Sequence, residues 1–303
     1  MSDLTIRSLY PEDIQQVAEI ESRLAGSPRM FFLEKRLAAA SAMIDSFITC
    51  AVTDDKKLAG YGFARVLEGE FGTKSSMAVL DTIGVAPEYQ SRGIGKMVLA
   101  GIERRMKNRN INALLTQTLW SRHAMIRFFA ATGFSLASGQ IIERDTSPLS
   151  GDSVGALPGL VVRSLKGTDI ATIDKIDTKL TGLDRSAYYA SKFREMLDDS
   201  DVRVSMVAES EGVITGFIMA RVDYGEFGQV EKAAVIDTIG VHPDFTGSGV
   251  GHALLSQLLV TLSSLEVELV RTKVEHENSG LRNFLSRRGF KPSQRLLLAK
   301  EIL

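Results

Sequence analysis

Apolar residues fall into two alternating patterns along the first half of the chain. Runs typical of strands occur at residues 4–9, 46–52, 58–67, 77–85 and 113–119. Apolar positions at helical spacing predict helices at residues 11–24, 29–44, 93–107 and 123–131, and a last extended segment covers 135–142. Pro11 suits a first helical turn, and Glu12 and Asp13 follow where the helix dipole favours acidic side chains.

The order of these elements predicts the fold class. Three successive strands joined by short turns indicate an antiparallel meander. The strand, helix and strand after it indicate a parallel pair in the same sheet. We therefore expect a mixed α/β (α+β) fold with one central sheet that carries helices on both faces.

The second half of the chain repeats the first at an offset of 156 residues, without a gap from about residue 6 to 134. Arg7-Ser8-Leu9 recurs as Arg163-Ser164-Leu165, and Asp81-Thr82-Ile83-Gly84-Val85 recurs as Asp237-Thr238-Ile239-Gly240-Val241. The same elements are expected as strands at 160–165, 202–208, 213–222, 233–241, 267–274 and 294–301 and helices at 169–180, 186–198, 249–264 and 279–287. The period is far longer than that of solenoid repeats, so each copy is a whole domain.

The predicted domain organisation is two tandem copies with a linker. Residues 146–159 are rich in Ser, Gly and Pro and poor in periodic apolar positions, as linkers are. The first domain is assigned to residues 1–145 and the second to 160–303. Each copy has the usual size of an independent core.

Composition excludes several classes of protein. A formal charge of −1 argues against a nucleic-acid-binding protein, and no apolar run is long enough to cross a membrane. The N-terminus has no signal-peptide pattern, so a cytoplasmic location is the default expectation. Cys50 is expected to be a buried strand residue, and the four histidines have no metal-ligand spacing, so no metal is expected. The oligomeric state is left open.

The segment between the strand at 77–85 and the helix at 93–107 carries the strongest chemical signal. It reads Gln90-Ser91-Arg92-Gly93-Ile94-Gly95, with paired glycines where a helix begins. Backbone N–H groups at a helix N-terminus are unpaired, and glycines let a phosphate approach them. A P-loop would need Lys-Ser or Lys-Thr after the second glycine, and a Rossmann fingerprint would need a small residue at Val98. Neither is present.

A third type of phosphate loop fits. Gln/Arg-x-x-Gly-x-Gly/Ala after a strand ending in Val-x-Pro resembles the pyrophosphate loop of the GNAT superfamily of acyl-CoA-dependent N-acyltransferases. The first copy matches at every fixed position, and the second copy, Thr246-Gly247-Ser248-Gly249-Val250-Gly251, keeps the glycines but loses the Gln and Arg. The resemblance covers each copy and implies acetyl-CoA as co-substrate.

The resemblance also implies which residues contact coenzyme A. The pantetheine arm would lie along backbone groups of Ile83 and Val85, and of Ile239 and Val241, where two strands separate. Gly84 and Gly240 are compatible with a bulge there or with room for a neighbouring side chain. The two loops, with Asn278 of the second copy, complete the implied cofactor-binding set: Gln90, Ser91, Arg92, Gly93, Ile94, Gly95, Lys96, Thr246, Gly247, Ser248, Gly249, Val250, Gly251 and His252.

Candidate catalytic and acceptor-binding residues are less specific. Asp81 and Asp237 are strand carboxylates that could take a proton from the amine, or could pair with Arg65 or Arg221 in a purely structural role. Arg29 and Arg185 match across the copies, in the loop that covers the acceptor site in the family, and either could bind an acceptor anion or cover a helix end. The family's thiolate-protonating Tyr is absent, because Phe129 and Leu285 stand there.

The function that this predicts is transfer of an acetyl group from acetyl-CoA to a primary amine of a small molecule or protein. The alternative is an acyl-CoA-binding or scaffolding module in which one or both halves have lost catalysis. A third possibility is that the duplication only builds a pseudo-dimeric interface.

Overall fold

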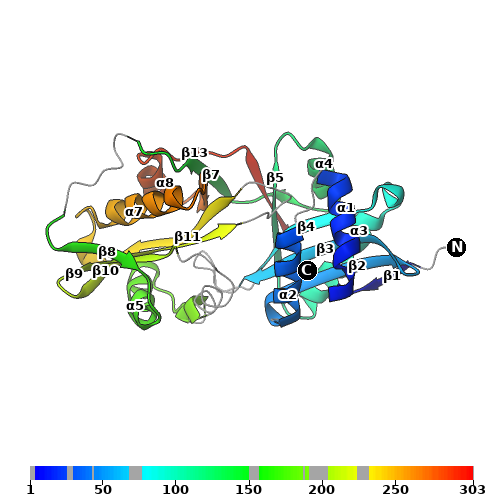
Figure 1. The fold of residues 1–303 in the computed structure, drawn as a ribbon, viewed down its shortest axis with the longest axis horizontal. Coiled ribbons are helices and arrows are strands. Elements are labelled where there is room, and N and C mark those ends of the chain that lie inside the picture. Colours follow the sequence, from blue (N-terminus) through cyan, green and yellow to red (C-terminus); the bar gives the residue numbers. More distant parts are fainter. Residues whose placement is uncertain are drawn as a thin grey trace.

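The computed structural model describes residues 4–25, 30–42, 44–67, 77–149, 157–186, 188–190, 204–223 and 232–302. Two lobes lie side by side along the long axis of the molecule, the first half coloured blue to cyan and the second green to orange (Figure 1). Each lobe is built on a sheet of seven strands. The mixed α/β fold class is therefore confirmed.

The first half follows the predicted order, with one difference at its start and a second at its end, where the extended segment expected at 135–142 is divided into two strands. Pro11–Asp13 forms a short 3-10 turn, η1, before the first α-helix. The elements are β1 (Leu4–Arg7), α1 (Ile14–Ala25), α2 (Met30–Ala42), β2 (Phe47–Asp54), β3 (Lys57–Leu67), β4 (Met77–Val85), η4 (Pro87–Tyr89), α3 (Ile94–Lys107), β5 (Ala113–Leu119), α4 (His123–Ala131), β6 (Ser135–Leu136) and β7 (Gly139–Asp145).

The second half repeats this order where it is described. Its elements are β8 (Leu160–Ser164), α5 (Ile170–Thr181), β9 (Met206–Ser210), β10 (Val213–Asp223), β11 (Ala233–Val241), α7 (Val250–Ser264), β12 (Leu269–Glu275), α8 (Ser279–Ser286), β13 (Lys291–Pro292) and β14 (Arg295–Glu301). The helix expected at 186–198 lies largely outside the described residues, as do residues 150–156 of the expected linker.

The two sheets exchange their last long strands. The first sheet has the order β1-β2-β3-β4-β5-β14-β6, so the C-terminal strand of the chain completes the N-terminal lobe. The second sheet has the order β13-β7-β12-β11-β10-β9-β8. In Figure 1 the red β14 lies in the lobe that is otherwise coloured blue to green. The boundaries at residues 145 and 160 stay a prediction, and each sheet contains a strand from the other side of them.

The exchange extends into the cores. Leu298 of β14 and Ile302 after it are buried with Val98 and Ile102 of α3, in the first lobe. Ile142 of β7 is buried among residues of the second lobe, such as Leu254 of α7. On the opposite face of the first sheet, α1 and α2 pack on β3 through a second cluster that includes Tyr61 and Phe63. Each sheet is thus covered by helices, and each core is completed by the other half of the chain.

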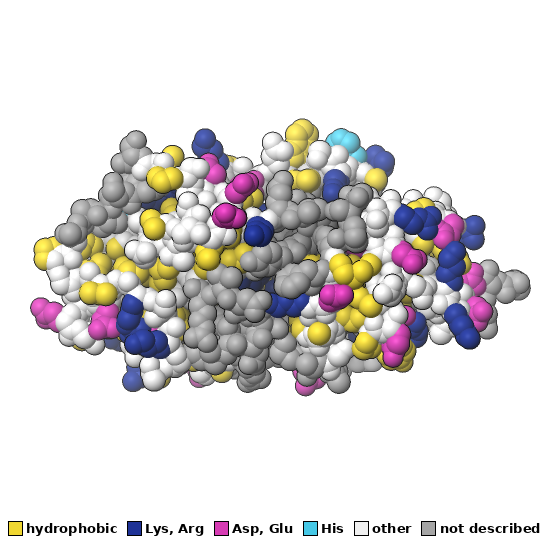
Figure 2. Space-filling view, viewed as in Figure 1, with side chains coloured by type: hydrophobic (Ala, Val, Ile, Leu, Met, Phe, Trp, Pro, Cys, Tyr) yellow, Lys and Arg dark blue, Asp and Glu magenta, His cyan; other side chains and the backbone are white. Residues whose placement is uncertain are grey.

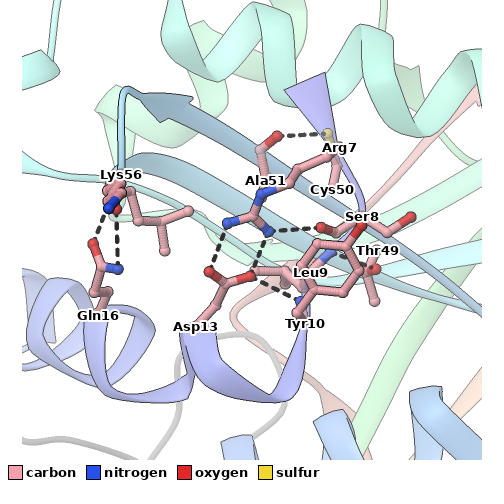
Figure 3. Close-up of polar contacts among 11 residues, drawn as sticks. Arg7, Ser8, Leu9, Tyr10, Asp13, Gln16, Thr49, Cys50, Ala51 and Lys56 are labelled. Carbon is pink, nitrogen blue, oxygen red and sulfur yellow. Dashed lines mark hydrogen bonds and ion pairs between the residues drawn. The ribbon is translucent and has the colours of Figure 1, made fainter. Parts of the chain in front are cut away.

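An ion pair fixes the first strand to the first helix. Arg7 at the end of β1 donates two hydrogen bonds to Asp13, at 2.6 and 2.7 Å, and Asp13 also accepts from the backbone N–H of Tyr10 at 2.8 Å (Figure 3). Burial raises the pKa of Asp13, but the bonds from Arg7 and Tyr10 outweigh it and the pKa is lowered. Arg163 and Asp169 repeat the arrangement, and the pKa of Asp169 is lowered chiefly by the hydrogen bond from Arg163.

We expect Asp13→Asn to lower the free energy of unfolding by about 2 kcal/mol near neutral pH, because it leaves Arg7 without its charged partner. A carboxyl whose pKa is lowered by folding stabilises the fold above its unfolded value, 3.8, and loses that contribution as the pH falls through its folded value. Urea unfolding of wild type and variant checks this. The difference between them should shrink below about pH 4, and a constant difference down to pH 2 would contradict the expectation.

Candidate active site

The parallel strands β4 and β5 separate after their first three paired residues. Their register covers only Met77 to Val79 of β4, although β4 continues to Val85 and β5 to Leu119. In the second lobe, β11 and β12 pair from Ala233 to Ile236, and β11 continues to Val241. Beyond these points the facing edges of the two strands have no ladder partner among the described residues, and each lobe therefore contains a split sheet.

A threonine marks the vertex of each split. The hydroxyl of Thr116 on β5 donates to the carbonyl oxygen of Leu80 at 3.0 Å, and that of Thr272 on β12 donates to the carbonyl oxygen of Ile236 at 2.9 Å. Each side chain satisfies the first backbone group left by the ending ladder. The sequence analysis missed this pair, although the two residues match at the repeat offset.

A β-bulge accompanies each split, and the bulged residue is the candidate catalytic aspartate. Phe63 pairs with Thr82 and Ala64 with Leu80, so Asp81 is the extra residue of β4; Asp237 is skipped in the same way on β11. Of the two alternatives considered for Gly84 and Gly240, a bulge or room for a neighbouring side chain, the structure shows the second. A Cβ on Gly84 would lie 2.5 Å from the ring of Tyr61, and one on Gly240 would lie 2.6 Å from Phe217. These glycines make room for neighbouring aromatic rings.

The loop of the first lobe exposes an open helix N-terminus. Gly93 caps α3 in the left-handed conformation, with a φ of 82°, and a Cβ there would have no heavy atom within 4 Å. The first helical hydrogen bond runs from Met97 N–H to the Gly93 carbonyl. Among the described residues, no hydrogen bond occupies the N–H groups of Ile94, Gly95 and Lys96. These groups and the helix dipole favour an anion.

The second glycine of the motif has a packing role as well. A Cβ on Gly95 would lie 3.1 Å from the ring of Phe128 on α4. Gly95 therefore lets α4 pack closely against the start of α3. The side chains of Gln90, Ser91, Arg92 and Lys96 are exposed around this opening.

Charged and aromatic contacts hold the start of the first loop in place. Glu88 in η4 forms ion pairs with Lys57 at 2.8 Å and Arg23 at 2.9 Å, and the hydrogen bond from Lys57 lowers the pKa of Glu88 to about 2. The hydroxyl of Tyr89 donates to Asp54 at 3.1 Å, and the guanidinium of Arg92 lies 5.6 Å from the centre of the Tyr89 ring. These contacts preorganise the loop.

The loop of the second lobe is less open. Gly249 caps α7 with a φ of 90°, but a Cβ there would lie 3.2 Å from the side chain of Leu157, in the segment between the two halves. Phe245 stands at the position of Tyr89 and lacks its hydroxyl, and Thr246 and Ser248 replace Gln90 and Arg92. An apolar side chain therefore lies where the first lobe leaves space.

The candidate catalytic aspartates are engaged by arginines. Asp81 has 1% of its surface exposed and accepts from Nε of Arg65 at 2.7 Å and from Nη2 at 3.1 Å. A second guanidinium, that of Arg36, lies 3.8 Å away. In the second lobe, Arg221 Nε lies 3.6 Å from Asp237. These contacts match the structural alternative, in which each aspartate pairs with an arginine.

A second buried carboxylate lies on the same side of each sheet. Glu21 of α1 accepts hydrogen bonds from the hydroxyl of Tyr61 on β3 and, at 3.3 Å, from Thr82 on β4. Its counterpart at the repeat offset is Asp177 of α5, which pairs with Arg185 at 3.0 Å. The sequence analysis overlooked Glu21 and Asp177 because the helical pattern alone does not show that this position faces the bulge.

The remaining predicted residues are placed as follows. Arg185 is buried and its guanidinium lies 4.4 Å from the centre of the Tyr188 ring, so its contacts are within the lobe. Burial, reinforced by Asp177, raises the pKa of Tyr189. The side chain of Asn278 accepts from Leu281 N–H at 3.0 Å and caps α8. Arg29 lies outside the described residues.

The split sheet, the bulge and the open helix N-terminus beside them define an acyltransferase of the acyl-CoA-dependent type. The Acetyltransferase (GNAT) family matches residues 13–134 and again residues 171–290. The chain therefore belongs to the GNAT acetyltransferase family and carries two copies of its domain.

Individual relatives agree with this assignment. The [ribosomal protein bS18]-alanine N-acetyltransferase of Escherichia coli K12 is 26% identical over 134 residues, which cover 44% of this chain and 82% of that protein. Among solved structures, a tandem GNAT protein from the clavulanic acid biosynthesis pathway has a TM-score of 0.70 at 18% identity and covers 99% of both chains. A GCN5-related N-acetyltransferase from Sphaerobacter thermophilus has a TM-score of 0.63 at 17% identity, covering 99% of this chain and 96% of its own. Both structures share the two-lobed fold.

None of the described helices is long and apolar enough to cross a membrane. The described His, Cys, Asp and Glu side chains form no group of three or more that could hold a metal ion.

Proposed function

We propose that the protein transfers an acetyl group from acetyl-CoA to a primary amine, and that the first lobe is its principal coenzyme site. The observation that carries this proposal is the open N-terminus of α3, where Gly93 leaves space beside the unpaired N–H groups of Ile94, Gly95 and Lys96. Backbone donors at a helix start are suited to a diphosphate. Arg92 and Lys96 add positive charge at the rim.

Each part of the cleft has a proposed task. Backbone groups of Ile83 and Val85, on the unpaired edge of β4, would hold the pantetheine arm and polarise the thioester carbonyl. In the second lobe, Ile239 and Val241 have the equivalent position. The coenzyme supplies an activated acetyl group whose thiol, with a pKa near 8.5, leaves readily without a protonating tyrosine. The absence of a tyrosine at Phe129 and Leu285 is thus compatible with catalysis.

The amine must lose a proton before it attacks, since its ordinary pKa is about 10. We propose Asp81 as the group that takes this proton, directly or through water, with Arg65 fixing the direction of the carboxylate. Glu21 is the rival candidate because it is buried beside Thr82 at the same bulge. Asp237 would have the equivalent role in the second lobe.

A non-catalytic second lobe is the alternative that a specific observation favours. Leu157 lies against Gly249, and the loop lacks the Gln and Arg of the first copy. We propose that this lobe acts mainly as a scaffold, through β7, β14 and the surface between the lobes. The acceptor class includes protein N-termini, since the Escherichia coli relative is named for a ribosomal-protein alanine.

The test is a thiol-release assay with acetyl-CoA and a panel of amines that includes small polyamines, amino sugars, amino acids and an alanine-terminated peptide. We expect thiol release that depends on one class of amine, together with binding of acetyl-CoA in calorimetry. Tight binding without turnover on any amine would instead identify a binding module. Failure to bind acetyl-CoA would refute the coenzyme site.

Substitutions at the two buried carboxylates separate their roles. Asp81→Asn is expected to leave acetyl-CoA affinity unchanged and to lower turnover at least about tenfold, as loss of a general base does. Glu21→Gln is the matched control and should change turnover less. Thermal unfolding of both variants shows whether the fold is kept. Unchanged turnover in Asp81→Asn would reject the proposed base, and a large loss only in Glu21→Gln would transfer the role to Glu21.

A further inference from the structure

A hollow lies at the junction of the two lobes, on the side of the sheets that faces α1 and α5. Its empty space is about 690 Å³ including its open mouth. Residues at matching positions of the two copies line it, for example Arg65 and Arg221, or Ile141 and Leu297. Since Asp237 and the vertex threonines Thr116 and Thr272 also line it, the hollow adjoins both split sheets.

The walls of this hollow differ between the lobes. In the first lobe Leu115 on β5 lines it, next to the apolar side chains of Leu67 and Val79. At the matching positions of the second lobe, Arg271 replaces Leu115 and Lys273 replaces Gln117. The second-lobe wall therefore carries two more cationic side chains than the first-lobe wall at these matched positions. In Figure 2, basic side chains are visible near the centre of this face, between the two lobes.

Among the described cations that line the hollow, Arg271 has no ion pair, whereas the others do. Arg65 pairs with Asp81, Arg221 lies 3.6 Å from Asp237, and Lys273 pairs with Glu275 at 2.6 Å. Arg271 has 4% of its surface exposed, and its Nε has no hydrogen-bond partner in the part of the chain that the structure describes. A guanidinium cannot lose its charge in a protein, and a buried charge without a partner is strongly unfavourable. An anion bound beside this group would therefore be stabilised.

We propose that this hollow binds the carboxylate or phosphate of an anionic acceptor amine, with Arg271 and Lys273 as its ligands. The assignment of this ligand as the acceptor amine rests on the proposed acetyl transfer. A guanidinium presents paired donors that match both anions, and Lys273 adds a point charge. The apolar wall around Leu115 and Leu297 accommodates a short hydrocarbon chain between the anion and the amine. The second lobe thereby supplies an acceptor subsite beside both split sheets.

The matched variants exchange each residue for its counterpart in the first copy, Arg271→Leu and Lys273→Gln. Leucine is accommodated at the equivalent site, and replacing an unpaired buried charge by an apolar side chain is expected to keep the fold. Lys175→Gln, on the exposed face of α5, removes the same charge without touching the hollow. Thermal unfolding confirms that each variant is folded.

Binding and turnover are measured separately. In calorimetry, hexanoate and hexyl phosphate serve as probes and hexanol as the neutral control; in the thiol-release assay, ε-aminocaproate is compared with hexylamine. We expect at least one anionic probe to bind the wild type and to bind Arg271→Leu about 10- to 100-fold more weakly, with Lys175→Gln unchanged. Arg271→Leu should also raise the KM for ε-aminocaproate and leave the KM for hexylamine unchanged.

The outcomes distinguish this inference from the proposed function. Failure of both anionic probes to bind the wild type, or equal binding to wild type and Arg271→Leu, would overturn the anion site, even if neutral amines are acetylated. Probe binding that depends on Arg271, with no turnover on any amine, would support the anion site and refute the acetyltransferase proposal.

Discussion

Replacing Gly93 by glutamate is expected to weaken binding of acetyl-CoA to the full chain at least about 100-fold, or about 3 kcal/mol. The residue has a φ of 82°, and the space in front of it is open. A carboxylate placed there would enter that space and repel the diphosphate that the N–H groups of α3 are proposed to hold. Calorimetry with acetyl-CoA measures the affinity and the number of sites.

Controls separate charge from backbone strain. Gly93→Asn keeps a residue that tolerates the left-handed region, so it should bind acetyl-CoA far better than Gly93→Glu does. Gly249→Glu should change the affinity of the strong site less than about twofold, because Leu157 already contacts Gly249 in the second lobe. A stoichiometry of two, with equal losses in Gly93→Glu and Gly249→Glu, would contradict the unequal roles of the lobes.

Deleting β14 is expected to destabilise the lobe that the other half of the chain builds. A chain that stops at residue 294 loses the strand that pairs with β5 from Ala113 to Leu119, and the core of the first lobe loses Leu298 and Ile302. Burial of two such side chains contributes about 3 to 6 kcal/mol before the ladder is counted. We expect the unfolding midpoint of the first lobe to fall by more than about 10 °C.

Hydrogen exchange read out by peptide locates the effect. In the point variant Leu298→Ala, protection should fall in β4 and β5 of the first lobe, although the substitution lies in the last residues of the chain. Ile142→Ala is the reciprocal variant and should lower protection in β11 and β12. Leu136→Ala, at a side chain with 69% of its surface exposed, is the control. Loss of protection confined to the half that carries each substitution would contradict the strand exchange.

Local patterns of apolar residues predicted the type and order of those elements that form from contiguous residues. The meander β2-β3-β4 and the parallel pair β4-β5 follow from apolar runs and from the helix between the last two strands. Asp13 was placed in the first turn because acidic residues suit a helix start, and the structure adds its partner Arg7. The bulge, in contrast, lies at Asp81, whereas the sequence left open whether Gly84 marked a bulge or room for a side chain, because pairing across strands rather than glycine content decides the register.

The sequence by itself determined that this protein is a duplicated GNAT acetyltransferase with a glycine-bearing helix start in each copy, because the repeat and the loop motif are properties of contiguous residues. Only the tertiary structure decided that β7 and β14 change places, since the two strands are equivalent at the repeat offset and either could complete either sheet. It also decided which helix start is open. Leu157 approaches Gly249 through space, and Arg271 and Leu115 line one hollow at the lobe junction, and neither arrangement is encoded in local spacing.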